Sequence, residues 1–407
     1  MRRSLLYILF LFSVQAYCVE KDTLSHFLED IVITRDKNVS PIKNSDTRTV
    51  KLEMDFMHRL PKIMGNADPL HYSQMLPGIQ TNAEYDAGLH IQGCDNSHNL
   101  ISIEGVPVYN ASHLLGFFST FNPSHFSRMS ITKSVTAAEG YGRIGGMLNM
   151  ESDKKIPQKT NGEFSVGLMS SQGTIRIPFG RNAALFTSLR FSYLNLLYSS
   201  FLKIDEKQLL YSFGDINISY LHKIGNKHTV YFDFYSGVDN ASLVSIENNK
   251  NKNNVPSMGV MESFNTETSW GNAVGAIHWD YKDKRLVLKQ SFYFTGYKNN
   301  LKLIGNYNVA LPSKIYDIGY TSKAYMGNLE AGISIINHNV TPQIPEYSDQ
   351  SIKTNNRDYR QHTLESSVYS KYSGNILNDI SYDVALKADL YNNIEGYTYT
   401  ALNPYAM

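Results

Sequence analysis

The sequence predicts a small α+β domain followed by a transmembrane antiparallel β-barrel, and three observations support this fold class. From Gly162 onward, segments of alternating apolar and polar residues recur, as expected of strands with one lipid-facing side. Short turns and long polar connections alternate between these segments. After the first residues, no apolar run approaches the roughly twenty residues of a transmembrane helix, so a closed barrel is the remaining way to cross a bilayer.

The N-terminus predicts export. Two arginines precede an apolar run at 5–12 that is too short to span a bilayer, and small residues follow at the spacing of a cleavage site. We expect a signal peptide over residues 1–18. A lipoprotein anchor on Cys18 is the less favoured alternative, because the bulky Tyr17 stands where such an anchor needs a small residue. After cleavage Cys94 is the remaining cysteine, so no internal disulfide can form.

The overall composition argues against nucleic acid and fits a membrane barrel. Of 407 residues, 18% are charged and 12% aromatic, and the formal net charge is +1. Such a chain lacks the basic face that nucleic acid needs, so we expect no nucleic-acid partner. The 28 tyrosines and 19 phenylalanines fit aromatic girdles at the membrane interfaces, although general β-propensity explains any single one equally well.

The barrel region divides into about ten or eleven expected strands. They lie at 162–170, 172–179, 183–195, 209–221, 228–238, 269–280, 285–298, 313–324, 327–338, 362–372 and 378–391. Short turns at 223–227, 282–284 and 326–328 alternate with long polar stretches at 239–268, 299–312 and 339–361. Outer-membrane barrels have short periplasmic turns and long outer loops, whereas a soluble sandwich has no reason to differ between its two ends.

The residues before the barrel predict a compact α+β unit. The pair Asp68–Pro69 provides an N-cap and a first-turn proline, so we expect a short helix at 69–76. The pair Asn122–Pro123 predicts a second short helix in the same way. Glu104–Gly105 predicts a tight turn. Strands are expected at 89–92, 99–103, 106–109 and 129–133.

Four stretches between residues 66 and 150 occur in an order that indicates a family: LPGIQ, EGVPVYN, FFSTFNP and EGYGRIGG. This region resembles the plug domain of TonB-dependent outer-membrane receptors. The resemblance implies a linker at 19–55, a plug domain at 56–153 and a partial transmembrane barrel at 154–407, with about half of the roughly 22 strands that such receptors close. The chain also ends without the terminal aromatic strand that barrel assembly recognises, so we expect a fragment or a truncated gene product.

The resemblance also implies a structural motif that holds the plug against the barrel wall. Its residues here are Gly93, Asp95, Glu104, Gly105, Val106, Pro107, Tyr109, Tyr141 and Gly142. Gln92 replaces the usual arginine, Cys94 a glycine and Glu104 an aspartate. Since arginine offers a fork of donors to carboxylates, its loss removes that route of anchoring. At the glycines we expect positive φ or close backbone approach.

A short extended stretch between the signal peptide and the plug resembles a TonB box: Asp30, Ile31, Val32, Ile33 and Thr34. A β-branched stretch on a polar linker suits strand addition to the edge of a partner's sheet, where main-chain hydrogen bonds provide the grip. The implied partner is a TonB-type periplasmic energy-transducing protein.

The implied function is energy-coupled uptake of a ligand too large for porins, by a receptor in the Gram-negative outer membrane. Its expected partners are outer-membrane lipid, the TonB-type protein, the imported ligand and a surface lipoprotein. The sequence leaves siderophore, haem, cobalamin, glycan and peptide open as ligands. Alternatives are a surface adhesin without transport, which needs neither box nor plug, a non-functional truncated receptor, and a passive porin, whose barrel would start directly after the signal.

The sequence contains no catalytic or cofactor motif that we recognise. The histidines show no HExxH spacing, and neither GxSxG nor a phosphate-binding glycine loop occurs. We therefore expect no enzyme activity and no cofactor. Five histidines of the plug are interpreted as packing or surface residues in preference to metal or haem ligands: His71, His90, His98, His113 and His125.

Overall fold

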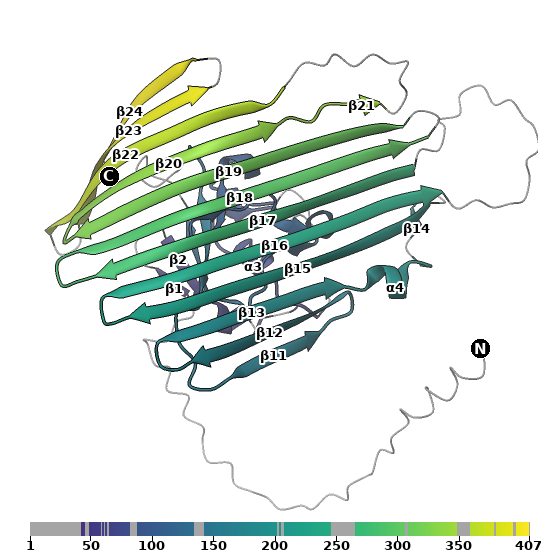
Figure 1. Cartoon of the computed structure of the whole chain (residues 1–407), viewed down its shortest axis with the longest axis horizontal. Helices are drawn as coiled ribbons and strands as arrows, with labels where there is room; N and C mark the ends of the chain where they lie inside the picture. The colour runs from purple at the N-terminus through teal and green to yellow at the C-terminus, as the bar shows by residue number, and fades with distance from the viewer. Residues whose placement is uncertain are drawn as a thin grey trace, which may run out of the picture. The chain divides into compact units, whose positions relative to one another are not determined.

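The computed structural model describes residues 42–44, 49–57, 59–60, 62, 65–81, 88–133, 142–201, 203–204, 207–245, 265–305, 308–347, 359–377, 380–393 and 396–406. These residues form two main sheets, a small one before residue 153 and a large one after residue 160 (Figure 1). The predicted signal peptide, the Asp30–Thr34 segment and Tyr141 lie outside the described residues. In the part of the chain that is described, no helix is long and apolar enough to cross a membrane.

The small sheet has six strands in the order β1-β2-β9-β10-β5-β6. Their bounds are β1 Ile42–Asn44, β2 Thr49–Glu53, β5 Leu100–Ile103, β6 Val106–Pro107, β9 Phe126–Thr132 and β10 Met147–Ser152. β10 runs parallel to β5, and the other neighbours are antiparallel. Alternate residues of β2 and β10 are buried, as expected of strands with one face in a core. Leu52, Met129 and Leu148 belong to that core, and residues 42–153 are called the N-terminal domain below.

The predicted helix after Asp68 is confirmed but shorter. Helix α3 spans Pro69–Ser73, and the His71 backbone N–H donates to the Asp68 cap at 3.1 Å. At its end the N–H groups of Met75 and Leu76 bond carbonyls three residues back. This tighter hydrogen-bonding pattern ends the α-helix one turn early.

The second predicted helix is wrong. Residues 123–125 form a turn that leads directly into β9. The Asn122 side chain accepts a hydrogen bond from the Ser124 N–H at 3.0 Å, and the Asn122 carbonyl accepts one from the His125 N–H at 3.0 Å. An asparagine before proline stabilises such a turn as readily as a helix start, and the strand that follows decides between them.

The predicted turn at Glu104–Gly105 is confirmed. It joins β5 to β6, and its φ values of 49° and 82° make it a primed hairpin turn. The remaining short elements of the domain are α2 Met54–Met57, β3 Ile79–Gln80, β4 His90–Ile91, η1 Asn96–His98, β7 Ser112–His113, η2 Leu114–Gly116 and β8 Phe118–Ser119.

The large sheet, called the wall below, has 14 strands, and twelve of them follow one another in chain order, each antiparallel to the next. Their bounds are β11 Asn161–Val166, β12 Ser170–Phe179, β13 Ala183–Ser192, β15 Lys207–Ile224, β16 His228–Ser245, β17 Asn265–Lys282, β18 Val287–Ile304, β19 Val309–Met326, β20 Leu329–Thr341, β22 Gln361–Leu377, β23 Ile380–Asn393 and β24 Thr398–Ala406. Beside this path lie β14 Lys203–Ile204, β21 Glu346–Tyr347 and the helix α4 Leu194–Tyr198. Each predicted strand overlaps a strand of the wall, and β24 is an additional one. The predicted strand at 162–170 ends at Val166, and the one at 183–195 ends at Ser192, before α4.

The predicted long connection at 299–312 is wrong. β18 continues to Ile304, β19 begins at Val309, and the two pair through this stretch, with Asn300 opposite Pro312. β18 has 18 residues, whereas about ten suffice to cross a bilayer. Apolar residues pair across this stretch, Leu301 with Leu311 and Leu303 with Val309, and such cross-strand pairs extend both strands.

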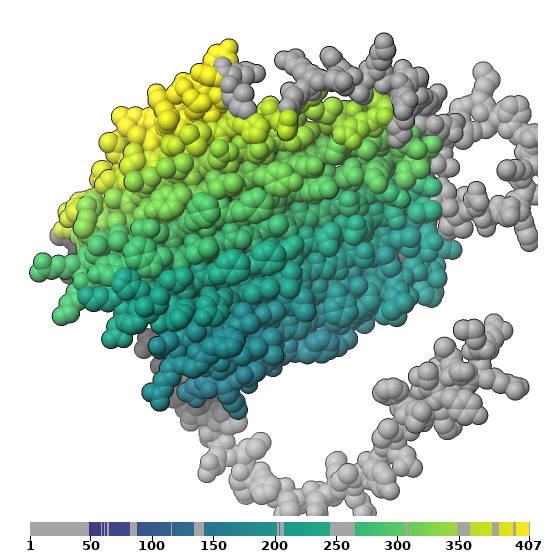
Figure 2. Space-filling view, in the orientation of Figure 1, coloured from purple at the N-terminus to yellow at the C-terminus, as the bar shows by residue number. Residues whose placement is uncertain are grey.

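The wall has an apolar face and a face that contacts the N-terminal domain. Exposed apolar residues stand directly opposite one another on β15, β16, β17 and β18: Tyr220, Phe232, Ile277 and Phe292. A band of this kind is expected of a lipid-facing surface, and Figure 2 views the wall from this side. On the opposite face Tyr235 and Val274 join the core of the N-terminal domain, which lies behind the central strands in Figure 1.

Candidate functional site

Buried polar side chains gather where the N-terminal domain meets the wall. The inward face of the wall carries four buried aspartates: Asp215, Asp233, Asp239 and Asp317. Burying an ionised carboxylate is costly unless charged or hydrogen-bonded partners surround it. Each of the four has a partner in the N-terminal domain, so this contact is the candidate site.

His113 is the centre of the first contact. It stands on β7 and is buried between two wall strands, with Nδ1 at 2.7 Å from Asp239 Oδ2 and Nε2 at 3.1 Å from Asp215 Oδ2. Its ring also stacks on Phe213, with 4.6 Å between the ring centroids. Because both ring nitrogens face carboxylate oxygens, both must donate, which requires the imidazolium form.

Burial alone would disfavour that charged form, but the hydrogen bonds to Asp215 and Asp239 outweigh it and raise the pKa of His113. A wall arginine completes the cluster: Arg190 Nε donates to Asp215 Oδ2 at 2.7 Å, and Arg190 Nη2 donates to the Ser119 carbonyl at 2.8 Å. The cations of His113 and Arg190 therefore face the carboxylates of Asp215 and Asp239, and all four side chains are buried. The net charge is zero, so removal of any one member would leave an uncompensated buried charge.

The backbone between β7 and β8 is fixed by the same groups. The Tyr211 hydroxyl donates to Asp239 and accepts from the Leu114 N–H. At the other end of the segment, the Ser119 N–H donates to Asp68 Oδ2 at 2.5 Å, while Asp68 Oδ1 caps α3. One carboxylate thus connects the helix start to the segment that contacts the wall.

His125 makes a second contact with the wall, and its ring is neutral where that of His113 is charged. Its Nδ1 lies 2.9 Å from Ser188 Oγ and its Nε2 lies 2.9 Å from Ser219 Oγ. Ser219 donates its hydroxyl proton to Asp233 Oδ1 at 2.5 Å, so its oxygen accepts from His125 Nε2–H. The nitrogen Nδ1 then accepts from Ser188. Burial disfavours the charged form and lowers the pKa of His125 to about 3, so this ring is neutral.

The neutral state of His125 predicts acid sensitivity of the contact. A histidine whose pKa falls from 6.5 to about 3 on folding contributes stability above pH 6.5 that is lost as the pH falls toward 3. We expect His125→Gln to remove this contribution to the decrease of the unfolding free energy between pH 6.5 and pH 3, which is called the acid-side slope below. The readout is urea unfolding at a series of pH values, followed by fluorescence of Trp270, whose Nε1 donates to the Ser112 carbonyl at 3.5 Å. Trp279→Phe removes the second tryptophan from the signal.

The matched control is His98→Gln, at an exposed histidine of the same domain. It should keep the slope of the parent protein. An unchanged slope in His125→Gln would show that another group carries the acid response.

Glu104, a predicted motif residue, lies at a third contact. Its Oε2 accepts from Lys154 Nζ at 3.0 Å and from the Tyr231 hydroxyl of the wall at 3.3 Å, and its Oε1 accepts from the Ser152 N–H at 2.7 Å. Ser152 Oγ donates to Asp233 at 2.7 Å. The hairpin turn and the end of β10 are therefore tied to the same wall strand, β16.

Three further motif residues meet the wall. The Tyr109 hydroxyl donates to Asp317, which also contacts His338 Nδ1 at 2.9 Å. The Pro107 carbonyl accepts from Thr295 Oγ1 at 2.6 Å. Gly142 has a φ of 63°, and a Cβ added there would lie 3.5 Å from the Glu365 carboxylate oxygens.

The remaining motif residues have positions within the N-terminal domain. Val106 is buried in the core, and the Gly105 N–H donates to Asn149 Oδ1 at 2.7 Å. Gly93 adopts a φ of 78° after β4, and the Asp95 carbonyl accepts from the His98 N–H at 2.9 Å. Their role as a plug motif stays a prediction, and Tyr141 lies outside the described residues.

His113 is the functional candidate that the sequence analysis missed. Gln92, which replaces the usual arginine, packs against Gly78, where an added Cβ would meet its Nε2 at 2.5 Å. His113 is the residue of the N-terminal domain that faces the wall carboxylates Asp215 and Asp239. A signal was present in the sequence, since Asp215 and Asp239 occupy positions of apolar–polar alternation that point to one face of their strands.

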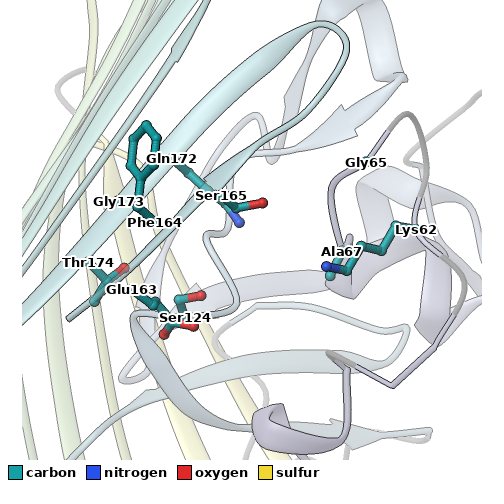
Figure 3. A pocket seen from close by; sticks show the side chains of 10 residues that line it. All are labelled: Lys62, Gly65, Ala67, Ser124, Glu163, Phe164, Ser165, Gln172, Gly173 and Thr174. Atoms are coloured by element: carbon teal, nitrogen blue, oxygen red, sulfur yellow. The ribbon is translucent and has the colours of Figure 1, made fainter. Parts of the chain in front are cut away.

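A small cavity lies at the edge of the contact. It has a volume of 160 Å³ and is lined by Lys62, Gly65 and Ala67 of the N-terminal domain and by residues of β11 and β12, including Glu163 and Gln172 (Figure 3). Within the described residues, no group of three or more His, Cys, Asp or Glu side chains could hold a metal ion.

Comparison with known proteins identifies the fold. No protein-family model and no curated protein matches the chain. A variant of the ferric enterobactin receptor of Pseudomonas aeruginosa matches with a TM-score of 0.61 and 12% identity over 89% of this chain and 59% of its own. The siderophore receptor PirA of Acinetobacter baumannii gives 0.59 and 13% over 87% and 58%. The copper transporter OprC gives 0.62 and 10% over 90% and 61%.

This chain thus spans about three fifths of the length of these structures. TM-scores of 0.59 to 0.62 establish a shared fold, and identities of 10% to 13% leave the ligand open. In all three cases the match extends over both the small sheet and the wall, since it covers 87% or more of this chain. The chain has the fold of a TonB-dependent receptor, with a plug domain packed against the inner face of part of a β-barrel wall.

Proposed function

We propose that this protein is an outer-membrane receptor that takes up a ligand too large for porins, using energy relayed by a TonB-type periplasmic protein. The observation that carries the proposal is the buried charged contact of His113 with Asp215 and Asp239. Apolar side chains of similar volume would stabilise a permanent interface as well or better. Charged and hydrogen-bonded partners suit an interface that must open, because water can replace each bond when the plug moves.

The strand order of the small sheet supports a route for the pulling force. In this proposal Asp30–Thr34 pairs with the partner by strand addition, and the linker passes tension to β1 and β2. β2 pairs with β9, and β9 begins directly after His125. Tension on β2 therefore reaches the His125 contact with the wall through a single strand pair.

The domain assignment follows from the same proposal. Residues 1–18 are the signal peptide, 19–55 the linker with the TonB box, 56–153 the plug and 154–407 the barrel wall in the Gram-negative outer membrane. β1 and β2 fall in the linker range and yet belong to the plug sheet, since β1 pairs with β2 and β2 pairs with β9. A metal chelate is the first ligand class to test, because the similar structures include receptors for siderophores.

Uptake measurements test the proposal. Cells that produce the protein are compared with cells lacking it for accumulation of a ferric siderophore, haem, cobalamin, an oligosaccharide and a peptide. We expect one of these probes to accumulate only in producing cells and only while the inner membrane is energised. Accumulation that persists after addition of a protonophore would indicate a passive pore, and surface binding without accumulation would indicate an adhesin.

A further inference from the structure

Three neighbouring turns at one end of the wall carry a cluster of exposed cations. The turns join β12 to β13, β15 to β16 and β17 to β18, and these six strands are consecutive in the sheet. The cluster, called the basic rim, consists of Arg181, Lys223, Lys227, Lys282, Lys284 and Arg285. The three turns, residues 180–182, 223–227 and 282–286, contain one acidic residue, Asp283, and it pairs with Lys227 at 3.2 Å.

The stability of the fold gains little from this concentration of charge. The whole chain has a net charge of +1, so the rim is a local feature and does not reflect an excess of basic residues. The next turn of the sheet, around Gly327, is uncharged over residues 326–328. Like charges on adjacent turns repel each other, and exposed cations contribute little to stability. A partner of opposite charge would explain the cluster.

The position of the rim identifies the partner. Aromatic side chains precede the same turns on the lipid-facing side: Phe179 is 54% exposed and Trp279 is 37% exposed, and the Trp279 ring stacks on His228. Tryptophan and other aromatic rings lie where acyl chains meet headgroups. Lys282 follows Trp279 by three residues, or about 10 Å along the strand. The rim therefore lies at the depth of lipid phosphates.

We propose that the basic rim binds the phosphate groups of anionic phospholipids in the leaflet that meets the short turns. This inference rests on the proposed membrane location. Lysine and arginine form charge-assisted hydrogen bonds to phosphate oxygens, and several cations on one surface act together on a charged leaflet. A cell-wall polymer or an acidic protein segment would also be attracted to the charge, but neither accounts for the aromatic side chains beside it.

Lipid retention by the full-length protein tests the rim directly. The protein is purified in a zwitterionic detergent and titrated with phosphatidylglycerol or phosphatidylcholine, and bound lipids are counted by native mass spectrometry. The test variant is Lys223→Gln, Lys284→Gln, Arg285→Gln, which leaves the Lys227–Asp283 pair intact. We expect it to bind phosphatidylglycerol roughly a hundredfold more weakly than the parent, with phosphatidylcholine unaffected.

The matched control removes three exposed lysines at the opposite ends of the strands: Lys203→Gln, Lys298→Gln, Lys302→Gln. It should retain phosphatidylglycerol like the parent. Equal retention by test and control variants would overturn the inference, as would a loss confined to binding of isolated peptidoglycan. Lipid retention is measured without any imported ligand. Failure of the uptake proposal would therefore not change this result, and the two failures can be told apart.

Discussion

Val32→Pro is expected to abolish uptake of whichever probe the protein accumulates, while binding of that probe at the cell surface stays unchanged. Proline removes the backbone N–H and fixes φ, so residue 32 could no longer donate to the edge of a partner's sheet. Ligand contacts on the plug and wall would remain. Uptake and surface binding are measured on the same cells, so that loss of expression is recognised as loss of both.

Val32→Thr is the matched control, since threonine keeps the N–H and the β-branched side chain. It should transport like the parent protein. Equal uptake by the proline variant would remove Asp30–Thr34 from the mechanism and leave the fold assignment untouched. Loss of surface binding in the proline variant alone would point to a folding defect.

His113→Ala is expected to weaken the contact between plug and wall by about 3–5 kcal/mol, because it leaves a buried carboxylate without its cationic partner. Asp239 would lose its cation, while Asp215 would keep Arg190. Urea unfolding followed by Trp270 fluorescence, in the Trp279→Phe background, measures the change. Trp270 is buried, and its indole donates to the Ser112 carbonyl next to His113, so its emission should change when the plug leaves the wall.

A second variant separates charge from packing. His113→Gln combined with Asp239→Asn removes one buried charge of each sign and keeps hydrogen-bonding groups of similar size. The double variant should lose less unfolding free energy than the sum of the losses in the two single variants, which is the result of a double-mutant cycle for a coupled pair. Additive losses would mean that His113 and Asp239 act independently and that the cluster is not a charge-balanced unit.

Local sequence signals predicted most of the fold because they act over a few residues. The Asp68 cap, the Glu104–Gly105 turn and the wall strands all follow from propensity and period-two alternation. The two wrong predictions share a cause. The residues at Asn122 were compatible with a helix start and with a turn, and the stretch 299–312 mixes asparagines and a lysine with apolar residues that suit a strand as well as a loop. In both places the pairing partners, β10 for β9 and β19 for β18, decided the outcome.

The sequence by itself determined the class of fold and the alternation that separates the two faces of the wall, and it predicted a motif that includes Glu104 and Tyr109. Only the tertiary structure decided what those residues contact. His113 and Asp239 are 126 residues apart, and local periodicity carries no information on such a pair. The charge states also depend on tertiary contacts: two histidines of one domain are cationic at position 113 and neutral at position 125, because carboxylates surround the first ring and serine hydroxyls the second.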